Sequence, residues 1–225
     1  MTDTQTQLEL VVRTIAQTAV DNEKYFGDLD AVVGDGDFGY SLARGFEKVL
    51  ENWDGFDRTD PGTFLKKVGM MITSRIGGTS GPIWGTAFLR AGMTAGSAAE
   101  LSGEQVVTML RAATDGIKMR GQSDVGDKTL LDALVPMTDT IEAELGSGKT
   151  TAAVLASAAT ATRAAAEATS DMVARRGRAS YTGDRSRGSV DAGAMGVAVI
   201  VEQIAQVWAQ QESTQQTTTS TEGVS

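Results

Sequence analysis

The chain has 225 residues, an apolar fraction of 41% and a formal net charge of −9, which fits one large or two small globular domains. The acidic charge argues against a nucleic-acid or anionic-membrane partner, and no apolar run approaches the roughly 18 residues of a membrane span. The sequence has no cysteine and no histidine, which excludes disulfides, thiolate chemistry and any imidazole base, phosphate carrier or covalent anchor. The N-terminal residues lack the basic and apolar regions of a signal peptide, so we expect a cytoplasmic protein.

Apolar residues recur with the 3.6-residue helical period along almost the whole chain, and no stretch alternates with a period of two. Asp60 and Pro61 form a good helix start, and Ser102 with Gln105 forms a plausible capping box. The spacing therefore predicts one helical domain over residues 1–210 and a disordered polar tail over 211–225. The eight predicted helices cover residues 8–19, 42–53, 61–72, 82–91, 102–117, 129–141, 150–175 and 193–210.

Four connections contain more glycine and polar residues than a turn requires. They read GDGDFG, RIGGTSGP, GQSDVGDKT and RGRASYTGDRSRGSVDAG, and they follow the first, third, fifth and seventh predicted helices. In an up-and-down bundle, alternate loops lie at the same end. All four loops are therefore predicted to meet at one functional end.

The first of these loops gathers three aspartates, Asp30, Asp35 and Asp37, within eight residues. Carboxylates this close repel one another unless a cation lies among them. Mg²⁺ takes one or two carboxylates together with phosphate oxygens, so three aspartates suit two such ions. The loop predicts a metal site.

The other three loops are suited to bind an anion. Glycines before Pro82 and around Lys128 let phosphate approach backbone N–H groups at helix starts. The fourth loop adds a basic cluster to an acidic protein, consisting of Arg175, Arg176, Arg178, Arg185 and Arg187. Together with the aspartates, these features predict a site for a nucleotide polyphosphate with Mg²⁺.

Each loop taken alone also fits an ordinary turn, and two motifs are rejected. The stretch GSGKTT, Gly146–Thr151, resembles the end of a P-loop, but Ala143 stands where the first glycine is required and no strand precedes it. The aspartate loop is not an EF-hand, because the twelfth position counted from Asp35 is Phe46 instead of glutamate.

The stretches LDAVVGDGDFG, IGGTSGPIWGT, GDKTLLDALVP and ARRGRASYTGDRSRGSVDAGA, in this order, resemble the nucleotide-binding L subunit of dihydroxyacetone kinases over residues 5–210. The resemblance implies an all-α closed barrel of eight antiparallel up-and-down helices, with ADP or ATP bound at one end through two Mg²⁺ ions. It implies that Asp30, Asp35 and Asp37 are the metal ligands and that Arg178 is catalytic. The implied nucleotide-site residues are Phe38, Gly39, Tyr40, Ser41, Thr79, Ser80, Gly121, Leu130, Arg178, Asp191, Ala192 and Gly193.

The chain departs from the pattern of this family at three positions. Phe38 stands in place of the usual histidine, Ser41 in place of the usual asparagine, and Ala192 in place of the proline of a DPG motif. The three aspartates are retained, so the metal assignment is unchanged.

In this family a separate K subunit or domain holds the ketose through a covalent bond to histidine. Because this chain has no histidine, the resemblance implies that it is inactive alone and serves a K subunit acting on dihydroxyacetone or a related ketose such as a tetrulose. Either ATP exchanges at the site, or a phosphotransferase-system phosphocarrier rephosphorylates bound ADP; a homodimer is also considered. The alternative function is a nucleotide-dependent regulator that binds a transcription factor through the loop end, and a plain helical scaffold is the least favoured reading.

Overall fold

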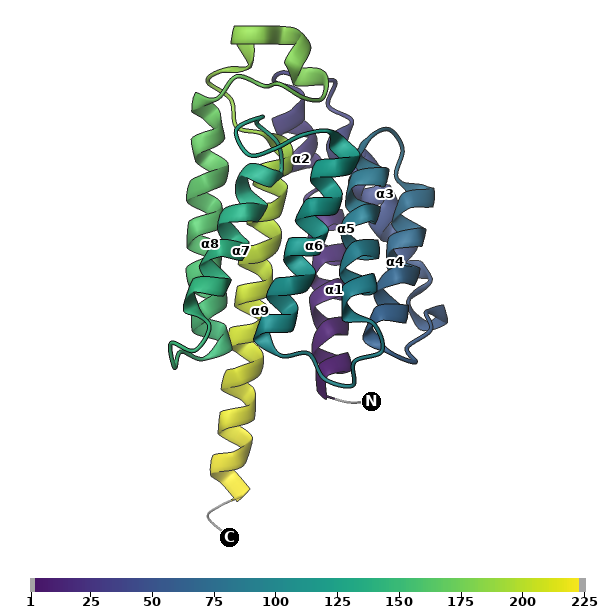
Figure 1. Ribbon diagram of the computed structural model, residues 1–225, viewed down its shortest axis with the longest axis vertical. Helices are drawn as coiled ribbons and strands as arrows, with labels where there is room; N and C mark the ends of the chain where they lie inside the picture. The colour runs from purple at the N-terminus through teal and green to yellow at the C-terminus, as the bar shows by residue number, and fades with distance from the viewer. Residues whose placement is uncertain (1–2, 223–225) are drawn as a thin grey trace.

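A computed structural model describes residues 3–222 of the chain, with side chains for residues 4–214. Within this part of the chain the backbone is helical and has no strand, which confirms the predicted all-α class (Figure 1). Its nine α-helices are α1 (Asp3–Asp21), α2 (Glu23–Asp30), α3 (Phe38–Glu51), α4 (Pro61–Arg75), α5 (Ser80–Ala95), α6 (Gly103–Gly121), α7 (Leu131–Glu144), α8 (Thr151–Ala168) and α9 (Ala192–Glu222). Three 3-10 segments lie between them, η1 (Trp53–Gly55), η2 (Thr169–Asp171) and η3 (Arg178–Ser186).

Helix α2 raises the number of helices in the described residues from the predicted eight to nine. Asn22 separates it from α1, because the backbone there leaves the α region (φ −105°, ψ 18°) while the side-chain amide donates to the Thr18 carbonyl (2.9 Å). Phe26 then anchors α2 in the core as its one buried residue. A single buried residue in eight gives too short a pattern for the helical period to be recognised in the sequence.

Helix α9 runs from Ala192 to Glu222, so its last turns fall within residues 211–225, for which disorder stays a prediction. No glycine or proline interrupts the chain between Gly196 and Gly223, so the two strongest helix breakers are absent from this stretch. Glu212 also ties this extension to the fold, because its carboxylate accepts a hydrogen bond from the N–H of Ala152 in the first turn of α8 (3.1 Å). Residues 223–225 of the predicted tail lie outside the described residues.

Helix α9 also contains the one stretch of described residues, Ala192–Thr214, that could cross a membrane by length and composition, with a mean hydropathy of 1.4. Nearly half of this stretch, 44%, is buried inside the fold. Met195, Ala198 and Val201 all belong to the core. This pattern is typical of the central helix of a globular core and is weak evidence for a membrane span.

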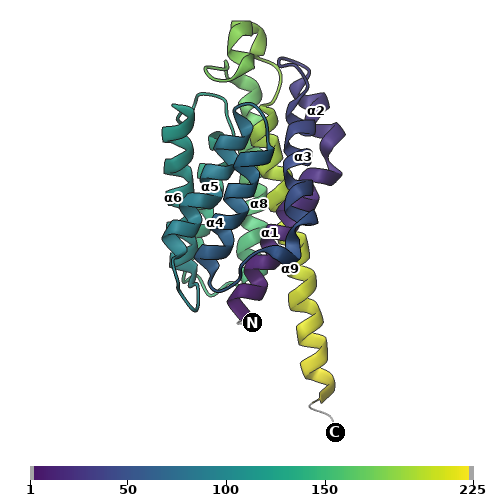
Figure 2. The ribbon, with the colours of Figure 1, turned by 90° about the vertical axis from the view of Figure 1, so that its right-hand side faces the viewer.

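The helices run up and down and pack against their neighbours along the chain (Figures 1 and 2). Helix α9 packs against α8 and α7 and also against α1, so the last helix meets the first. Phe46 is fully buried at the centre of the packing, edge-on to Trp84 (ring centroids 6.2 Å apart) and to Phe88 (6.3 Å). A cavity of about 500 Å³ lies between the helices and is lined mostly by apolar side chains, among them Ile117 and Val197.

The four glycine-rich connections lie together at the upper end of Figure 1, as the alternation of the helices predicts. They are the α2–α3, α4–α5 and α6–α7 loops and the segment with η2 and η3 that joins α8 to α9. The α7–α8 turn, which carries the rejected P-loop sequence, lies at the opposite end. The predicted gathering of the four loops at one end is confirmed, and the functional role of this end stays a prediction.

Gly39 holds α3 against α2 next to this end. A Cβ atom placed on Gly39 would lie 2.5 Å from the amide nitrogen of Gly27 and closer still to the carbonyl oxygen of Glu23. Because both obstacles are backbone, they cannot rotate away. We expect Gly39→Ala to lower the free energy of unfolding by about 2–3 kcal/mol, measured by urea denaturation.

The matched control for Gly39 is Gly55→Ala, because a Cβ at Gly55 meets no atom within 4 Å. This variant should unfold within about 0.5 kcal/mol of the parent chain. Equal stability of the two variants would contradict the close-packing role of Gly39.

Candidate metal and nucleotide site

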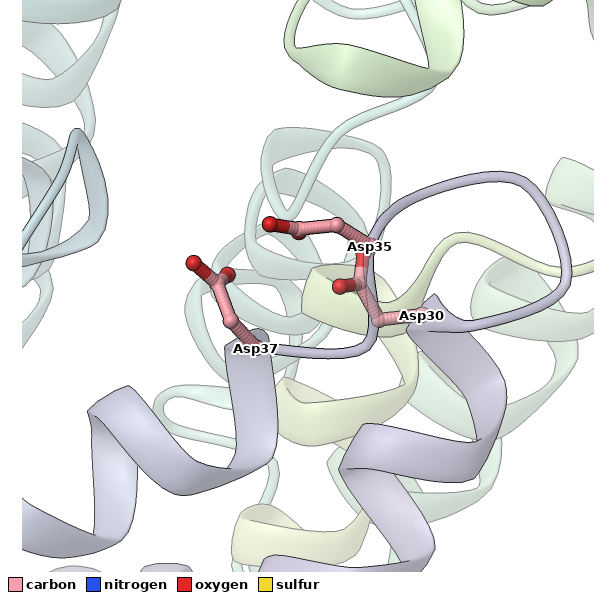
Figure 3. A group of neighbouring side chains, drawn as sticks. All are labelled: Asp30, Asp35 and Asp37. Atoms are coloured by element: carbon pink, nitrogen blue, oxygen red, sulfur yellow. The ribbon is translucent and has the colours of Figure 1, made fainter.

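The three aspartates converge at the junction of α2 and α3. Asp30 ends α2 and is partly buried, whereas Asp35 lies in the loop, Asp37 precedes α3, and both are exposed. One carboxylate oxygen from each lies within 4.8 Å of the others. Figure 3 shows the three side chains directed toward a common space.

The loop is shaped by wrapping around Asp30. One carboxylate oxygen of Asp30 accepts hydrogen bonds from the N–H groups of Gly36 (2.9 Å) and Phe38 (3.4 Å). The carbonyl of Asp30 accepts from Gly34 N–H (2.6 Å), and a Cβ atom at Gly34 would overlap the Asp30 carboxylate. Gly36 has a φ of +77°, which glycine adopts without strain. The glycines therefore let the chain fold back so that Asp35 and Asp37 return to Asp30.

Arg178 reaches this cluster from the opposite loop. Its guanidinium forms ion pairs with Asp35 and with Asp37, the latter at 3.3 Å. The side chain is more than half exposed (56%), so these carboxylates hold it at the surface of the site. Arg178 is therefore the predicted site arginine that the structure places beside the aspartates.

The other predicted arginines do not converge on the aspartates. Arg175 and Arg176 pair with Asp127 at 3.8 and 3.6 Å, and Arg187 donates to the Asp171 carbonyl (2.8 Å). The sequence cluster is therefore divided, because neighbouring residues of an irregular segment point in different directions.

The residues present fit a divalent cation. Three carboxylates carry three negative charges, and the one cationic side chain paired with them, Arg178, neutralises a single charge. Carboxylate oxygens are the ligands that Mg²⁺ prefers. Asp30, Asp35 and Asp37 form the one group of three carboxylates with this spacing in the part of the chain that the structure describes.

Two of the predicted nucleotide-site groups come from the α4–α5 and α6–α7 loops. Thr79 precedes α5 and Ser80 begins it. Gly121 ends α6 against the first turn of α5, since a Cβ atom there would lie 3.1 Å from Cδ1 of Ile83. These three residues therefore form one neighbourhood at the loop end.

A second neighbourhood joins the start of α7 to the start of α9. A Cβ atom at Gly193 would lie 3.4 Å from Cβ of Leu130 and 3.1 Å from the carboxylate of Asp191. Ala192 is the first residue of α9. Phe38 packs on the next turn of the same helix, with its ring 3.6 Å from where a Cβ of Gly196 would lie.

Tyr40 and Ser41 lie on the first turn of α3. The ring of Tyr40 is exposed, lies under the guanidinium of Arg44 (5.3 Å) and lines a surface depression with Gly27 and Gly36 of the α2 side. Ser41 is partly buried. The assignment of these residues to a nucleotide site remains a prediction.

Two buried charged residues near the site are not predicted as site residues. Lys128 and Asp132 are only 2% and 4% exposed. Asp132 accepts hydrogen bonds from the N–H groups of Gly126 (2.5 Å) and Thr129 (2.7 Å) and so closes the turn that carries Lys128. A signal exists in the sequence, because Lys128 and Asp132 lie close to the apolar residues that begin α7, in DKTLLDALV. Charged residues are rarely buried unless they are paired.

Asp191 has an unusual protonation equilibrium. Burial raises the pKa of its carboxyl from 3.8 to about 7, and the nearby Asp132 carboxylate contributes. The Ala194 N–H, which donates to Asp191 at 2.7 Å, and the Lys128 ammonium act in the opposite direction. The folded chain therefore holds a proton at pH values where the unfolded chain has lost it.

This raised pKa predicts a pH-dependent stability. The contribution of Asp191 is fully present below about pH 4 and is lost as the pH rises through about 7, the folded pKa. Asp191→Asn keeps an acceptor for Ala194 but cannot ionise. We expect its melting temperature to rise relative to the parent chain between pH 4 and 8, by ~2–4 °C for each 1 kcal/mol involved.

The control for Asp191 is Asp184→Asn, an exposed aspartate of η3. Its melting temperature should follow that of the parent chain at every pH. If the melting temperatures of Asp191→Asn and the parent chain changed in parallel with pH, Asp191 would be ionised in the folded state.

The fold and the site together define an all-helical protein with a candidate metal centre at its loop end. The model of the DAK2 domain family matches residues 32–206, and the chain belongs to this family. The chain is 37% identical over 182 residues, 81% of its length and 87% of the relative, to the PEP-dependent dihydroxyacetone kinase, ADP-binding subunit DhaL, of Escherichia coli K12. The predicted resemblance to the L subunit is confirmed.

Longer relatives contain the same unit. The L-erythrulose 1-kinase of Mycolicibacterium smegmatis is 35% identical over 198 residues, which cover 85% of this chain and 34% of that protein. The crystal structure of the dihydroxyacetone kinase of C. freundii in complex with AMP-PNP and Mg²⁺ matches with a TM-score of 0.70 and 26% identity. That match covers 89% of this chain and 33% of the other, so the chain spans about a third of these kinases.

Proposed function

We propose that this chain is the nucleotide-binding, phosphoryl-transferring subunit of a kinase for dihydroxyacetone or a related short ketose. The observation that carries the proposal is the convergence of Asp30, Asp35 and Asp37 with Arg178 at the loop end. The relatives support it, because those with high coverage are named as ADP-binding subunits of dihydroxyacetone kinases. Other relatives are erythrulose kinases, which supports a short ketose as the final acceptor.

The proposed architecture is a closed helical barrel with the site at one end. The contact of α9 with α1 supports closure, with the short α2 as an addition to the eight longer helices. Asp30, Asp35 and Asp37 would hold two Mg²⁺ ions, which supply neutralisation of the nucleotide phosphates when bound. The C. freundii kinase crystallised with AMP-PNP and Mg²⁺ is consistent with this cofactor set.

Within this site Arg178 would act as the catalytic residue on the transferred phosphoryl group. A guanidinium fork donates to two phosphate oxygens at once, and its exposed position leaves it free to exchange carboxylates for phosphate. The proposed nucleotide-binding residues line the surrounding loops, from Phe38–Ser41 on α3 to Asp191–Gly193 at the start of α9. Transfer would then depend mainly on positioning and electrostatic stabilisation.

The acceptor ketose would be held by a separate K-type subunit in the cytoplasm. This chain has no histidine for a covalent ketose bond, and its DhaL relatives are named as subunits. The names of the relatives include both PEP-dependent and PTS-dependent kinases, so rephosphorylation of bound ADP by a phosphocarrier is one proposed route and exchange of ATP is the other. The regulatory alternative is not favoured, because these relatives are kinases.

The test is a coupled assay of ketose phosphorylation with each subunit alone and with both mixed. We expect no product from this chain with ATP and dihydroxyacetone or erythrulose at any pH, and product after the K subunit is added. Docking at the loop end should weaken as salt rises, because Arg178 and its neighbours would meet an acidic rim.

The mixture should therefore lose activity between low and high ionic strength, and bovine serum albumin in place of the K subunit serves as the control. Robust ketose phosphorylation by this chain alone would refute the two-subunit proposal.

A further inference from the structure

Lys128 is a buried ammonium that the proposed function does not use. Its side chain is 2% exposed, and its backbone adopts a left-handed φ of +62°, which is uncommon for a residue with a side chain. Burial lowers the pKa of Lys128, while the Asp191 carboxylate opposes this shift. A charge is retained in such a place only when its hydrogen bonds are satisfied.

All three protons of the ammonium have acceptors, and all three acceptors lie on one segment. Nζ of Lys128 donates to the backbone carbonyls of Met172 (3.3 Å), Ser186 and Ser189 (2.6 Å). Met172 precedes η3, Ser186 is its last residue and Ser189 follows it, and η3 begins with Arg178. We call residues 172–190 the arginine segment; the ammonium gathers its two ends around a single point.

The loop that carries Lys128 is itself held firmly. Asp132, on the first turn of α7, accepts the N–H groups of Gly126 and Thr129 on either side of the lysine. The carbonyl of Asp127 accepts a hydrogen bond from Arg175 N–H (3.0 Å), which adds a second link to the arginine segment. Lys128 therefore connects the arginine segment to the rigid start of α7.

Arg178 depends on this connection because its own side chain is mostly exposed. Its ion pairs are with Asp35 and Asp37, which belong to the metal cluster it has to serve. If metal ions held by those carboxylates bound phosphate, the carboxylates would no longer hold Arg178, and the backbone of the arginine segment would keep its guanidinium within reach. That backbone is gathered by the Lys128 ammonium.

We propose that Lys128 is a positioning residue for Arg178: its buried ammonium binds three carbonyls of the arginine segment and so fixes Arg178 over the aspartate cluster. The role in transfer rests on the proposed function, whereas the anchoring of the segment does not. Nothing about Lys128 requires contact with the nucleotide.

The absence of cysteine from the sequence permits a chemical rescue. Lys128→Cys removes the ammonium, and alkylation of the single thiol with 2-bromoethylamine in urea, followed by refolding, restores it on a side chain of nearly the same length. The parent chain, treated identically, has no thiol to alkylate. Lys149→Cys is the matched control, because Lys149 is an exposed lysine at the opposite end paired with Glu144.

The first readout is hydrogen exchange of the backbone amides in the full isolated chain. We expect Lys128→Cys to exchange faster in the arginine segment while α4 and α5 are unchanged, and aminoethylation to restore protection. Unchanged exchange in the arginine segment would overturn the proposal whatever the chain does catalytically. If Lys128→Cys does not refold, Lys128→Met is measured instead, and the aminoethylated protein must still regain the parental pattern.

The second readout is turnover with the K subunit. We expect Lys128→Cys to lower kcat by ~10-fold or more, with the KM for nucleotide changed by less than about threefold, and aminoethylation to restore kcat. The double variant Lys128→Cys, Arg178→Ala should have nearly the same kcat as Arg178→Ala alone. The reason is that Lys128 is proposed to act on transfer only through Arg178. If the two substitutions lowered kcat by independent factors that multiply, the proposal would be overturned. If the parent chain with the K subunit were inactive, the proposed function would be refuted, and the hydrogen-exchange result would decide whether Lys128 anchors the arginine segment.

Discussion

Asp35→Asn is expected to weaken binding of ADP in the presence of Mg²⁺ by tenfold or more, on the order of 1.4 kcal/mol. Asp35 is exposed, and among the described residues its ion pair is with Arg178, so the change removes the charge of a proposed metal ligand without removing a backbone contact. Calorimetric titration of ADP into the chain with Mg²⁺ measures the loss. With EDTA in place of Mg²⁺, binding to the parent chain should fall by ~100-fold or more, because the phosphates would then face three bare carboxylates.

The control for Asp35 is Asp28→Asn, which removes an exposed carboxylate of α2 that pairs with Lys24. Its ADP affinity should equal that of the parent chain, and both variants should melt within about 2 °C of it. If the ADP affinity of the parent chain were unchanged in EDTA, the proposal that a metal takes part in binding would be contradicted.

Arg178→Ala is expected to slow phosphoryl transfer in the mixture with the K subunit by ~100-fold or more while leaving the chain folded. The large effect on rate follows from the proposed role of Arg178 as a donor to the charge that develops on the transferred group. The small effect on stability follows from the exposure of the side chain and the low net value of an exposed ion pair. Initial rates at saturating ketose and the melting temperature are measured on the same preparation.

Lys149→Ala, which removes an exposed cation at the opposite end of the fold, is the control and should transfer within about twofold of the parent chain. Arg178→Lys should lie between Arg178→Ala and the parent chain, because it keeps the charge but loses the fork. A sharp fall in melting temperature of Arg178→Ala, with normal turnover of the remaining folded protein, would assign Arg178 a structural role.

The helix starts could be read from the sequence because their signals are local. Asp60 accepts the N–H of Thr63 (2.6 Å), as its position before Pro61 predicts, and Ser102 and Gln105 form both hydrogen bonds of the predicted capping box. These residues accept hydrogen bonds from N–H groups in the first helical turn. Such N–H groups lack a partner within the helix in any fold, so the signal is local.

Helix ends that depend on distant partners could not be read in this way. The alanine-rich pattern predicts a helix over residues 150–175, but α8 ends at Ala168. Thr169 there donates to the Ala166 carbonyl (2.5 Å) and accepts the N–H of Asp191 (2.8 Å), which lies 22 residues further along. That contact turns the chain into the arginine segment, and no local pattern reports it.

The sequence by itself determined the class of fold, the gathering of four loops at one end and the aspartate cluster. Helical periodicity, alternating loop positions and three carboxylates separated by glycines are all consequences of short-range order along the chain. Asp30, Asp35 and Asp37 lie in one loop, so their proximity requires only that the loop fold back on itself.

Only the tertiary structure decided which basic residues serve this end and how. Arg178 is the arginine placed on the aspartates, whereas Arg175 and Arg176 pair with Asp127 and Arg187 donates to the Asp171 carbonyl. The path of the arginine segment brings the carbonyls of Met172, Ser186 and Ser189 around Lys128, 44 to 61 residues away in sequence. Backbone carbonyls are alike in every residue, so a site that they build for an ammonium leaves no trace in composition or spacing and exists only once the loops have packed together.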